Sequence, residues 1–439
     1  MKYDVIVVGS GAGGYYSAIS SGKRGLKTVL IEGEELGGTA FRWGSLAVKR
    51  ILDGFRGVDE ELLRKLGVDI EEHYRGKYAQ GVRDMAYIEG IIRRKLEKAG
   101  VEVVIGKGRF VEEREDEVVV EAGGRVIEGK NLIVATGSTG DSLWRGERII
   151  THRELLAMEE LPERICIVGG GVEGIEIANI TSYIGIETVV VEMEESVLKG
   201  TENNLVEPVV ENLKRRGTEI YLNTRVEECI DLGDRVRVSL ENRGEMEFPL
   251  VVVTGIRTSN MPEGVDVETR EGYIVVDENY RTSNERIYAV GDINGIMGMA
   301  NAARYQGEQM GEILAGKAEG RAYPESLSRA IYTIPEIACT GFEGEYSGAA
   351  YFADTFRGFS KGVEKGFVVV YSNDGKTICG ISMSGMDVSE YLGPLGYLVD
   401  KKVTLEEARK IMMAHPTMME AFHDAVEDAI KSISHRKCQ

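Results

Sequence analysis

The sequence predicts an α/β protein with two Rossmann-like dinucleotide-binding domains and a C-terminal α+β domain. Two glycine fingerprints, Gly9–Gly14 and Gly169–Gly174, lie 160 residues apart. Each follows a short apolar strand and opens a helical segment. From about residue 323, alternating apolar residues predict antiparallel strands and then helices. A length of 439 residues suits roughly three domains.

The first β-α-β unit spans residues 1–33. Its strand Val5–Val8 precedes the first fingerprint, and Glu32 ends the second strand eighteen residues after Gly14. In such a unit the glycines allow a tight turn, close approach of the backbone to a pyrophosphate and close helix packing, while the acid bonds a ribose. The helix N-terminus favours the phosphates. The predicted dinucleotide-binding residues here are Gly9, Gly11, Gly13, Gly14 and Glu32.

The second β-α-β unit, at about 163–193, repeats this pattern with the same offsets. Its acid, Glu192, would repel the 2′-phosphate of NADP, whereas an NADP site needs Arg or Lys just after that strand. Only Lys199 follows, so NADH is favoured over NADPH. The chain is therefore expected to hold two dinucleotides. The predicted residues of this second site are Gly169, Gly171, Gly174 and Glu192.

The remaining elements follow from periodicity and from their boundaries. Helical periodicity covers 45–55, 78–99 and 301–314, and a helix is predicted at 404–412 and another from Pro416 onward. Strands are predicted at 101–105, 117–120, 132–137, 250–255, 287–292, 367–371 and 378–382.

Composition excludes several classes of protein. A formal charge of −19 argues against binding to nucleic acid or to an anionic membrane. No apolar run approaches the roughly 18 residues of a membrane span. The five cysteines are scattered without CxxC spacing, so we expect no metal site, no disulfide framework and a cytoplasmic location. Four glutamines beside abundant Glu, Arg and Lys suggest a thermophilic source.

Several motifs of this chain resemble those of a known protein family. Besides the two fingerprints, these motifs are Ala135–Gly137, Thr254–Asn260, Ala289–Asp292, Tyr332–Glu336 and His415–Glu420. In order and spacing the chain resembles the pyridine nucleotide-disulfide oxidoreductases, closest in pattern to the dihydrolipoamide dehydrogenases. The resemblance implies FAD at the first unit, NAD at the second and a homodimer formed by the C-terminal domain. It adds the following cofactor-binding residues: Gly38, Thr39, Thr136, Gly137, Gly255, Gly291 and Asp292.

The resemblance also implies domain boundaries. The FAD-binding domain is expected in two parts, at 1–145 and 263–322. The NAD-binding domain is expected between them, at 146–262, and the dimerisation domain at 323–439.

The redox disulfide of the family is missing. Ala40 and Ser45 stand where the resemblance places its two cysteines, and neither can form a disulfide or a thiolate–flavin adduct. An experimenter who wished to remove a disulfide would also choose Ala and Ser. However, Phe41, Arg42 and Trp43 between them have changed too, which favours natural divergence.

Other catalytic positions are kept. Lys49 and Glu176 match a family ion pair that lies against the flavin near N5, where a cation would stabilise the anionic reduced flavin. His415 and Glu420 match the acid–base pair that reaches across the dimer. Without a thiol to serve, His415 either protonates a different acceptor or is a relic retained for packing. The sequence leaves both alternatives open.

The predicted function is an FAD-dependent NADH oxidoreductase that passes electrons to a small-molecule acceptor without a disulfide. One alternative is a dihydrolipoamide dehydrogenase in name only, and the other is a non-catalytic FAD/NAD-binding sensor or scaffold. Aromatic and methionine residues near the catalytic segments are either core residues or the lining of an apolar acceptor pocket. They are Phe41, Trp43, Met297, Met299, Met412, Met413, Met418 and Met419.

Overall fold

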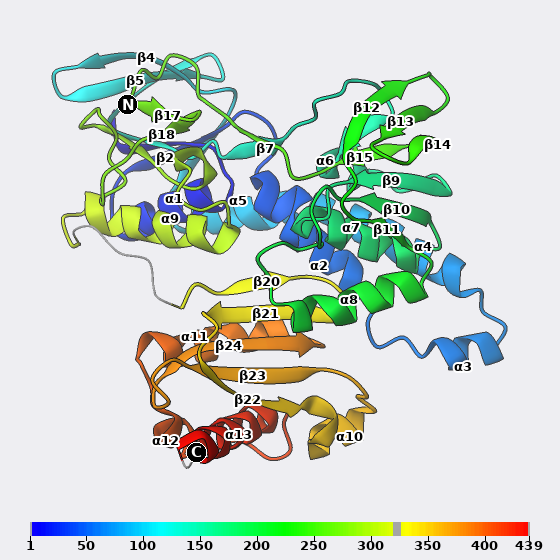
Figure 1. Cartoon of the computed structure of the whole chain (residues 1–439). Helices are drawn as coiled ribbons and strands as arrows, with labels where there is room; N and C mark the ends of the chain where they lie inside the picture. The colour runs from blue at the N-terminus through cyan, green and yellow to red at the C-terminus, as the bar shows by residue number, and fades with distance from the viewer. Residues whose placement is uncertain (1, 319–325, 438–439) are drawn as a thin grey trace. The chain divides into compact units, whose positions relative to one another are not determined.

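The computed structural model describes residues 2–318 and 326–437, and the chain divides into two compact units (Figure 1). The first unit comprises Met1–Gly169 and Val226–Ala322, and the second comprises Gly170–Arg225 and Tyr323–Gln439. The predicted boundary between residues 322 and 323 lies outside the described residues. The division into FAD-binding, NAD-binding and dimerisation segments stays a prediction.

A mixed sheet forms the centre of the first unit. Its strands run in the order β3-β2-β1-β6-β5-β4, and β19 pairs with β6. The pairs among β3, β2, β1, β6 and β19 are parallel, whereas β4, β5 and β6 are antiparallel. The strands are β1 (Lys2–Val8), β2 (Thr28–Glu32), β3 (Glu102–Ile105), β4 (Arg109–Arg114), β5 (Glu117–Ala122), β6 (Arg125–Val134) and β19 (Ile287–Ala289).

Helices cover this sheet because its central strands are apolar on both faces. Figure 1 shows α1 (Ala12–Lys23) beside α9 (Ala300–Leu314), and the core between these helices and the sheet contains Val5, Val7 and Met310. The further helices of this unit are α2 (Ser45–Asp53), α3 (Glu60–Lys65), α4 (Ile70–Asp84), α5 (Ile88–Lys98) and α6 (His152–Leu155).

Smaller sheets complete the first unit. The parallel strands β8, β15 and β9 lie side by side, and β12, β13 and β14 form an antiparallel sheet. Two-stranded ribbons join β7 to β16 and β17 to β18. Their bounds are β7 (Ser138–Gly140), β8 (Ile149–Thr151), β9 (Arg164–Val168), β12 (Val226–Asp231), β13 (Val236–Leu240), β14 (Gly244–Phe248), β15 (Val251–Val253), β16 (Arg257–Ser259), β17 (Thr269–Arg270) and β18 (Tyr273–Ile274).

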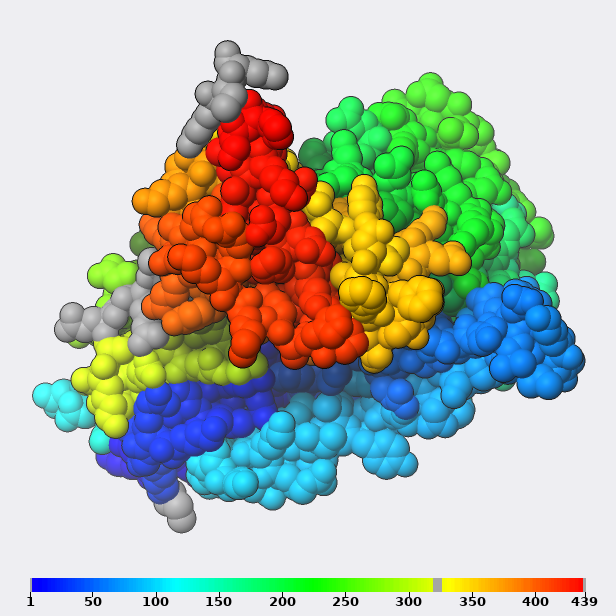
Figure 2. Space-filling view, turned by 90° about the horizontal axis from the view of Figure 1, so that it is seen from below, coloured from blue at the N-terminus to red at the C-terminus, as the bar shows by residue number. Residues whose placement is uncertain are grey.

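The second unit begins with α7 (Val172–Tyr183), β10 (Glu187–Val191), α8 (Asn203–Arg215) and β11 (Glu219–Tyr221). Its C-terminal part is an antiparallel sheet in the order β20-β21-β24-β23-β22. Figure 2 shows its last helix, α13 in red, at the surface between orange and gold segments of the same unit. The elements are β20 (Arg329–Ile331), β21 (Glu336–Gly341), β22 (Tyr346–Tyr351), α10 (Phe356–Lys361), β23 (Phe367–Ser372), β24 (Ile378–Gly385), α11 (Leu392–Asp400), α12 (Leu405–Ala408) and α13 (Glu420–Lys437).

Both predicted β-α-β units and the strand-rich C-terminal part are confirmed by these elements. Two helix predictions are wrong. The helix predicted at 404–412 is the short α12, and α13 begins at Glu420 rather than at Pro416. The reason at α13 is local. The side chain of Glu420 accepts the backbone N–H of Thr417 at 3.0 Å and so satisfies a donor ahead of the first helical turn.

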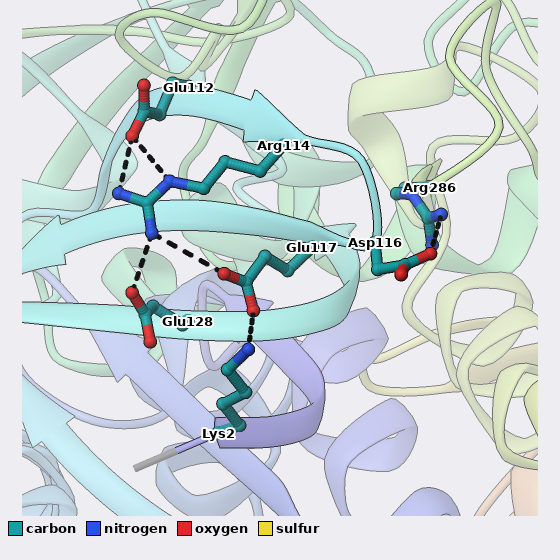
Figure 3. Close-up of polar contacts among 7 residues, drawn as sticks. All are labelled: Lys2, Glu112, Arg114, Asp116, Glu117, Glu128 and Arg286. Atoms are coloured by element: carbon teal, nitrogen blue, oxygen red, sulfur yellow. Dashed lines mark hydrogen bonds and ion pairs between the residues drawn. The ribbon is translucent and has the colours of Figure 1, made fainter.

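Charged side chains connect the antiparallel edge of the first unit (Figure 3). Arg114 contacts three carboxylates, at 2.6 Å from Glu112, 2.9 Å from Glu128 and 3.5 Å from Glu117. Glu117 also pairs with Lys2 at 2.8 Å, which ties β5 to β1. This group of five residues is called the β-edge ion network below.

Candidate functional site

Close backbone contacts explain the glycines of the first fingerprint. A Cβ on Gly9 would lie 2.3 Å from the carbonyl oxygen of Ala135, and one on Gly14 would lie 1.9 Å from the carbonyl oxygen of Gly9. A Cβ on Gly13 would lie 3.2 Å from the side chain of Val290. Gly11, in contrast, faces open space at the start of α1. The loop therefore leaves room for a phosphate where the helix N-terminus favours one.

Glu32 holds this loop in place. Its Oε2 accepts the backbone N–H of Ser10 at 2.9 Å and the hydroxyl of Ser10 at 2.5 Å, and its Oε1 accepts the N–H of Glu34 at 3.0 Å. The Ser10 hydroxyl in turn accepts the N–H of Gly37 at 2.8 Å. Ser10, which the sequence reasoning missed, thus links Glu32, the predicted ribose-binding acid, to the segment that follows it.

Asp292 lies within a polar cluster. Its Oδ2 accepts the hydroxyl of Ser138 at 2.6 Å, and the same hydroxyl accepts Nε–H of Arg257 at 2.8 Å. The N–H of Gly291 donates to the side-chain oxygen of Gln306 at 2.6 Å, which fixes the turn before Asp292. Sequence reasoning missed Ser138, Arg257 and Gln306, because each comes from a different part of the chain.

The turn after β6 presents a free donor. Among the described residues, the buried hydroxyl of Thr136 has no hydrogen-bond partner, and Gly137 follows with φ of +66°. A buried polar group without a partner costs free energy unless a ligand satisfies it. Thr136, the open space at Gly11 and the acid Glu32 together fit a bound dinucleotide.

The segment 37–49, which we call the exchange segment, starts against the first loop. A Cβ on Gly38 would come within 2.9 Å of the Cα of Gly11, so the two backbones touch. Thr39–Trp43 forms a π-helical turn that includes Ala40. Ser45 is the first residue of α2, and Lys49 is half-buried one turn later. The segment contains no cysteine.

The aromatic side chains of the exchange segment contact other parts of the first unit. Phe41 packs edge-on against Tyr15, with ring centroids 5.3 Å apart. The guanidinium of Arg153 lies 4.1 Å from the centre of the Trp43 ring, and that of Arg42 lies 5.4 Å away. Arg153 also pairs with a carboxylate, that of Glu34, at 2.6 Å. Aromatic and cation–π contacts therefore anchor this segment to α1 and α6.

The second fingerprint begins with Gly169, the last residue of this segment of the first unit, and continues from Gly170 in the second unit. In the first unit, a Cβ on Gly169 would lie 2.7 Å from Oγ1 of Thr254, and that hydroxyl donates to the carbonyl oxygen of Val168 at 3.1 Å. Gly255 follows with φ of +84°, a conformation that favours glycine.

In the second unit, Gly171 faces open space at the start of α7, and Gly174 is buried within that helix. Glu192 accepts the N–H of Gly170 at 2.6 Å. Lys199, the cation nearest to Glu192 in sequence, pairs with Glu194 at 2.8 Å. These contacts reproduce, around Glu192, the arrangement around Glu32.

Glu176 lies on α7 and is buried. It accepts the backbone N–H of Tyr332 at 2.9 Å, and one turn later Asn179 accepts the N–H of Ile334 at 3.1 Å. Burial raises the pKa of the Glu176 carboxyl to about 8, against a lowering by the Tyr332 N–H. Because Lys49 belongs to the first unit, its predicted ion pair with Glu176 stays a prediction.

His415 and Glu420 are brought together in the second unit. Nδ1 of His415 lies 2.7 Å from Oε1 of Glu420. The hydrogen bond from His415 is the largest cause that lowers the pKa of Glu420, followed by the N–H of Thr417. The imidazole is 62% exposed. The pair therefore has the geometry of an acid–base couple with a fixed tautomer.

Four of the methionines near the predicted catalytic segments lie between residues 412 and 419, and they differ in burial. Met418 is buried in the C-terminal core, and Met413 and Met419 pack against that core. Met412, in contrast, is 95% exposed. The first three are therefore core residues, as one of the two interpretations predicts.

The described cysteines are unsuited to thiolate chemistry. Cys166, Cys229 and Cys339 are buried, and Cys379 is half-buried. Burial raises the pKa of each of these thiols. Cys438 lies outside the described residues. Within 2–318 and 326–437 we find no group of three or more His, Cys, Asp or Glu placed to hold a metal ion, and no helix suited to crossing a membrane.

Comparison with protein families gives two matches. Residues 3–307 match the family described as "Pyridine nucleotide-disulphide oxidoreductase", and residues 327–426 match the dimerisation domain of the same family. Members of this family bind FAD and NAD(H). The second match contains both His415 and Glu420.

Curated relatives match nearly end to end. The chain is 30% identical to a dihydrolipoyl dehydrogenase of Pseudomonas aeruginosa, over 99% of this chain and 98% of that protein. It is 28% identical to one of Halobacterium salinarum, over 98% and 97%. Among solved structures, LpdA of Mycobacterium tuberculosis has a TM-score of 0.86 at 22% identity, covering 97% of this chain and 99% of that one. The flavoprotein disulfide reductase RclA of Escherichia coli has a TM-score of 0.82 at 18% identity, with the same coverage.

Proposed function

The chain belongs to the pyridine nucleotide-disulphide oxidoreductase family, and we propose that it is an FAD-dependent NADH oxidoreductase that works without a redox disulfide. The observation that carries this proposal is the exchange segment. Ala40 and Ser45 stand where the family resemblance places its cysteines, and neither side chain can shuttle electrons. Electrons that reach the flavin then leave it directly for a small-molecule acceptor.

The residues of the chain support binding of both cofactors. In the first fingerprint, Gly11 and Glu32 would hold the pyrophosphate and ribose of FAD, and Thr136 and Asp292 would bond the rest of that cofactor. When bound, FAD supplies the hydride acceptor. In the second, Glu192 would bond the ribose of NADH, and its charge would disfavour a 2′-phosphate.

The relatives are named as dihydrolipoyl dehydrogenases, which supports a rival activity. That reaction exchanges electrons between a dithiol and a protein disulfide. Burial raises the pKa of all four described thiols, which disfavours the thiolate that this reaction needs. The rival therefore lacks a nucleophile in the part of the chain that the structure describes.

The test is an anaerobic titration of the purified, FAD-loaded protein with NADH. We expect the flavin absorbance to bleach without the long-wavelength band of a thiolate–flavin complex, and NADPH to bleach it far less efficiently. NAD-dependent oxidation of dihydrolipoamide should be absent from the same preparation. If NADH binds but the flavin stays oxidised, the protein is a sensor or scaffold and the proposal is wrong.

We also propose a homodimer formed through the C-terminal domain. The match to the family's dimerisation domain supports this assembly. Sedimentation of the intact protein tests it, with a mass of about twice 48.3 kDa expected.

A further inference from the structure

Phe356 stands against the imidazole of His415. The two ring centroids are 5.5 Å apart and the planes meet at 78°, an edge-to-face contact. Phe356 begins α10, a different element from the loop that carries His415. Its ring is 73% exposed. Within one chain the exposed ring gains little from burial, so burial in its own fold does not explain the contact of Phe356 with His415.

Glu420 and Phe356 restrain different properties of His415. The carboxylate of Glu420, whose pKa is lowered by His415 and by the Thr417 N–H, fixes the Nδ1 side of the ring. This leaves Nε2 as the nitrogen that can exchange a proton with a ligand. Phe356 limits rotation of the imidazole about that hydrogen bond, because its ring occupies the space beside the imidazole.

Packing alone does not account for His415. Ala421 and Phe422, which follow Glu420 on α13, are buried in the core of this domain, whereas the imidazole of His415 is 62% exposed. A residue retained only for packing within its own chain would lie inside, as those two residues do. The restrained and exposed ring instead suits proton transfer to a group outside its own domain.

We propose that Phe356 is a positioning residue that holds the His415 imidazole ready to donate a proton from Nε2 to a quinone-type acceptor. This inference rests on the proposed function. NADH supplies one hydride, which is two electrons and one proton. Reduction of a quinone to its hydroquinone takes up two electrons and two protons. The second proton comes from the His415 imidazolium, which is then recharged from solvent.

The space around Phe356 explains what its removal would do. Phe356 and Glu420 both line a hollow of about 340 Å³, together with Met413 and His423. Truncation of Phe356 to alanine would enlarge this hollow and remove the ring that stands against the imidazole, so the imidazole could rotate toward the space that Phe356 vacates. The Nδ1 contact to Glu420 would remain available, so the change would affect the orientation of the ring more than its tautomer.

The experiment compares Phe356→Ala with Phe359→Ala in the full-length, FAD-loaded protein. Phe359 lies on the same helix, is 83% exposed and provides a matched control. Histidine labelled at the ring carbon reports on His415 by NMR, and loss of its signal in His415→Gln assigns it. We expect Phe356→Ala to shift the His415 signal and Phe359→Ala to leave it unchanged.

Kinetics provide the second readout. With menadione as the acceptor, Phe356→Ala should slow flavin reoxidation about 10-fold, because a misplaced imidazole loses part of the rate that a general acid contributes. Flavin reduction by NADH should be unchanged, and Phe356→Tyr should restore the rate. If Phe356→Ala matches Phe359→Ala in both NMR and reoxidation, the inference is wrong. If NADH does not reduce the flavin of the wild type, the proposed function is wrong instead. The NMR comparison still tests whether Phe356 holds the His415 ring in place.

Discussion

Gly170 donates its backbone N–H to the carboxylate of Glu192, with 2.6 Å between the nitrogen and Oε2. Ser10 donates to Glu32 in the same way at 2.9 Å. Each acid also uses its other oxygen to accept the backbone N–H two residues further along, at 2.8 Å and 3.0 Å respectively. The two acids therefore have a structural task besides any contact with ribose. They fix the glycine loop relative to the end of the second strand.

This double role gives the first prediction. Glu192→Ala removes both the proposed ribose acceptor and the support of the Gly170 loop, so we expect NADH to bind at least about 10-fold more weakly, as for a lost charged hydrogen bond. Fluorescence titration of the FAD-loaded protein measures this dissociation constant. Glu195→Gln removes an exposed charge three residues away and serves as the control. Unchanged NADH binding in Glu192→Ala would refute the assignment of this site.

The sequence predicted the repeated units well because their signals are local. A glycine with positive φ, a short apolar strand and an acid at a set distance all lie within about 30 residues. The contacts that complete the sites are not local. Ser138, Arg257 and Asp292 come from three separate segments, and a single sequence contains no signal that joins them.

The exchange segment shows the same limit. Its lack of cysteine is evident from the sequence, and so are its aromatic residues. The partners of those aromatics, Tyr15 on α1 and Arg153 on α6, depend on the tertiary structure. The start of α13 differs from the predicted start at Pro416 for a related reason. Proline marks many helix starts, but here the side chain of Glu420 accepts the N–H of Thr417 ahead of the first turn.

The raised pKa of Glu176 predicts a pH dependence of stability. A carboxyl whose pKa rises on folding from 4.5 to about 8 binds more protons in the folded state between these values. The free energy of unfolding should therefore fall as pH rises through this window, by up to about 1.4 kcal/mol per pH unit. Glu176→Gln should remove that fall. Urea unfolding of the protein at several pH values measures the difference.

Glu207→Gln, at an exposed position on α8, controls for the loss of one charge. If the free energy of unfolding of the wild type does not fall with rising pH relative to that of Glu176→Gln, the raised pKa of Glu176 is contradicted. Such a result would instead indicate a cation beside the carboxylate, as the predicted ion pair with Lys49 supplies.

The β-edge ion network predicts salt-sensitive thermal stability. Arg114 contacts three carboxylates, and networks of this kind matter more at high temperature than isolated pairs. Arg114→Met should lower the midpoint of thermal unfolding by a few degrees at low salt and by less at high salt. Arg145→Met, which removes one exposed pair with Asp141, should have a smaller effect. Equal shifts in the two variants would show that the network adds nothing beyond single pairs.

The exchange segment offers a gain-of-function test. If Ala40 and Ser45 occupy the two redox positions, the double substitution Ala40→Cys with Ser45→Cys should restore a thiolate beside the flavin. Partial reduction should then produce a long-wavelength absorbance band that the wild type lacks. Because His415 and Glu420 remain paired at 2.7 Å, some oxidation of dihydrolipoamide by NAD should appear as well.

Each single cysteine variant serves as a control, since one thiol cannot close a disulfide. A double variant that forms the disulfide yet lacks the band would indicate that the π-helical turn Thr39–Trp43 holds the sulfurs away from the flavin. In that case we would attribute the missing band to the contacts of Phe41 with Tyr15 and of Trp43 with Arg153. They fix the segment in its present conformation, so Trp43→Ala added to the double variant should then recover the band. Failure of that triple variant too would refute the placement of Ala40 and Ser45 at the redox positions.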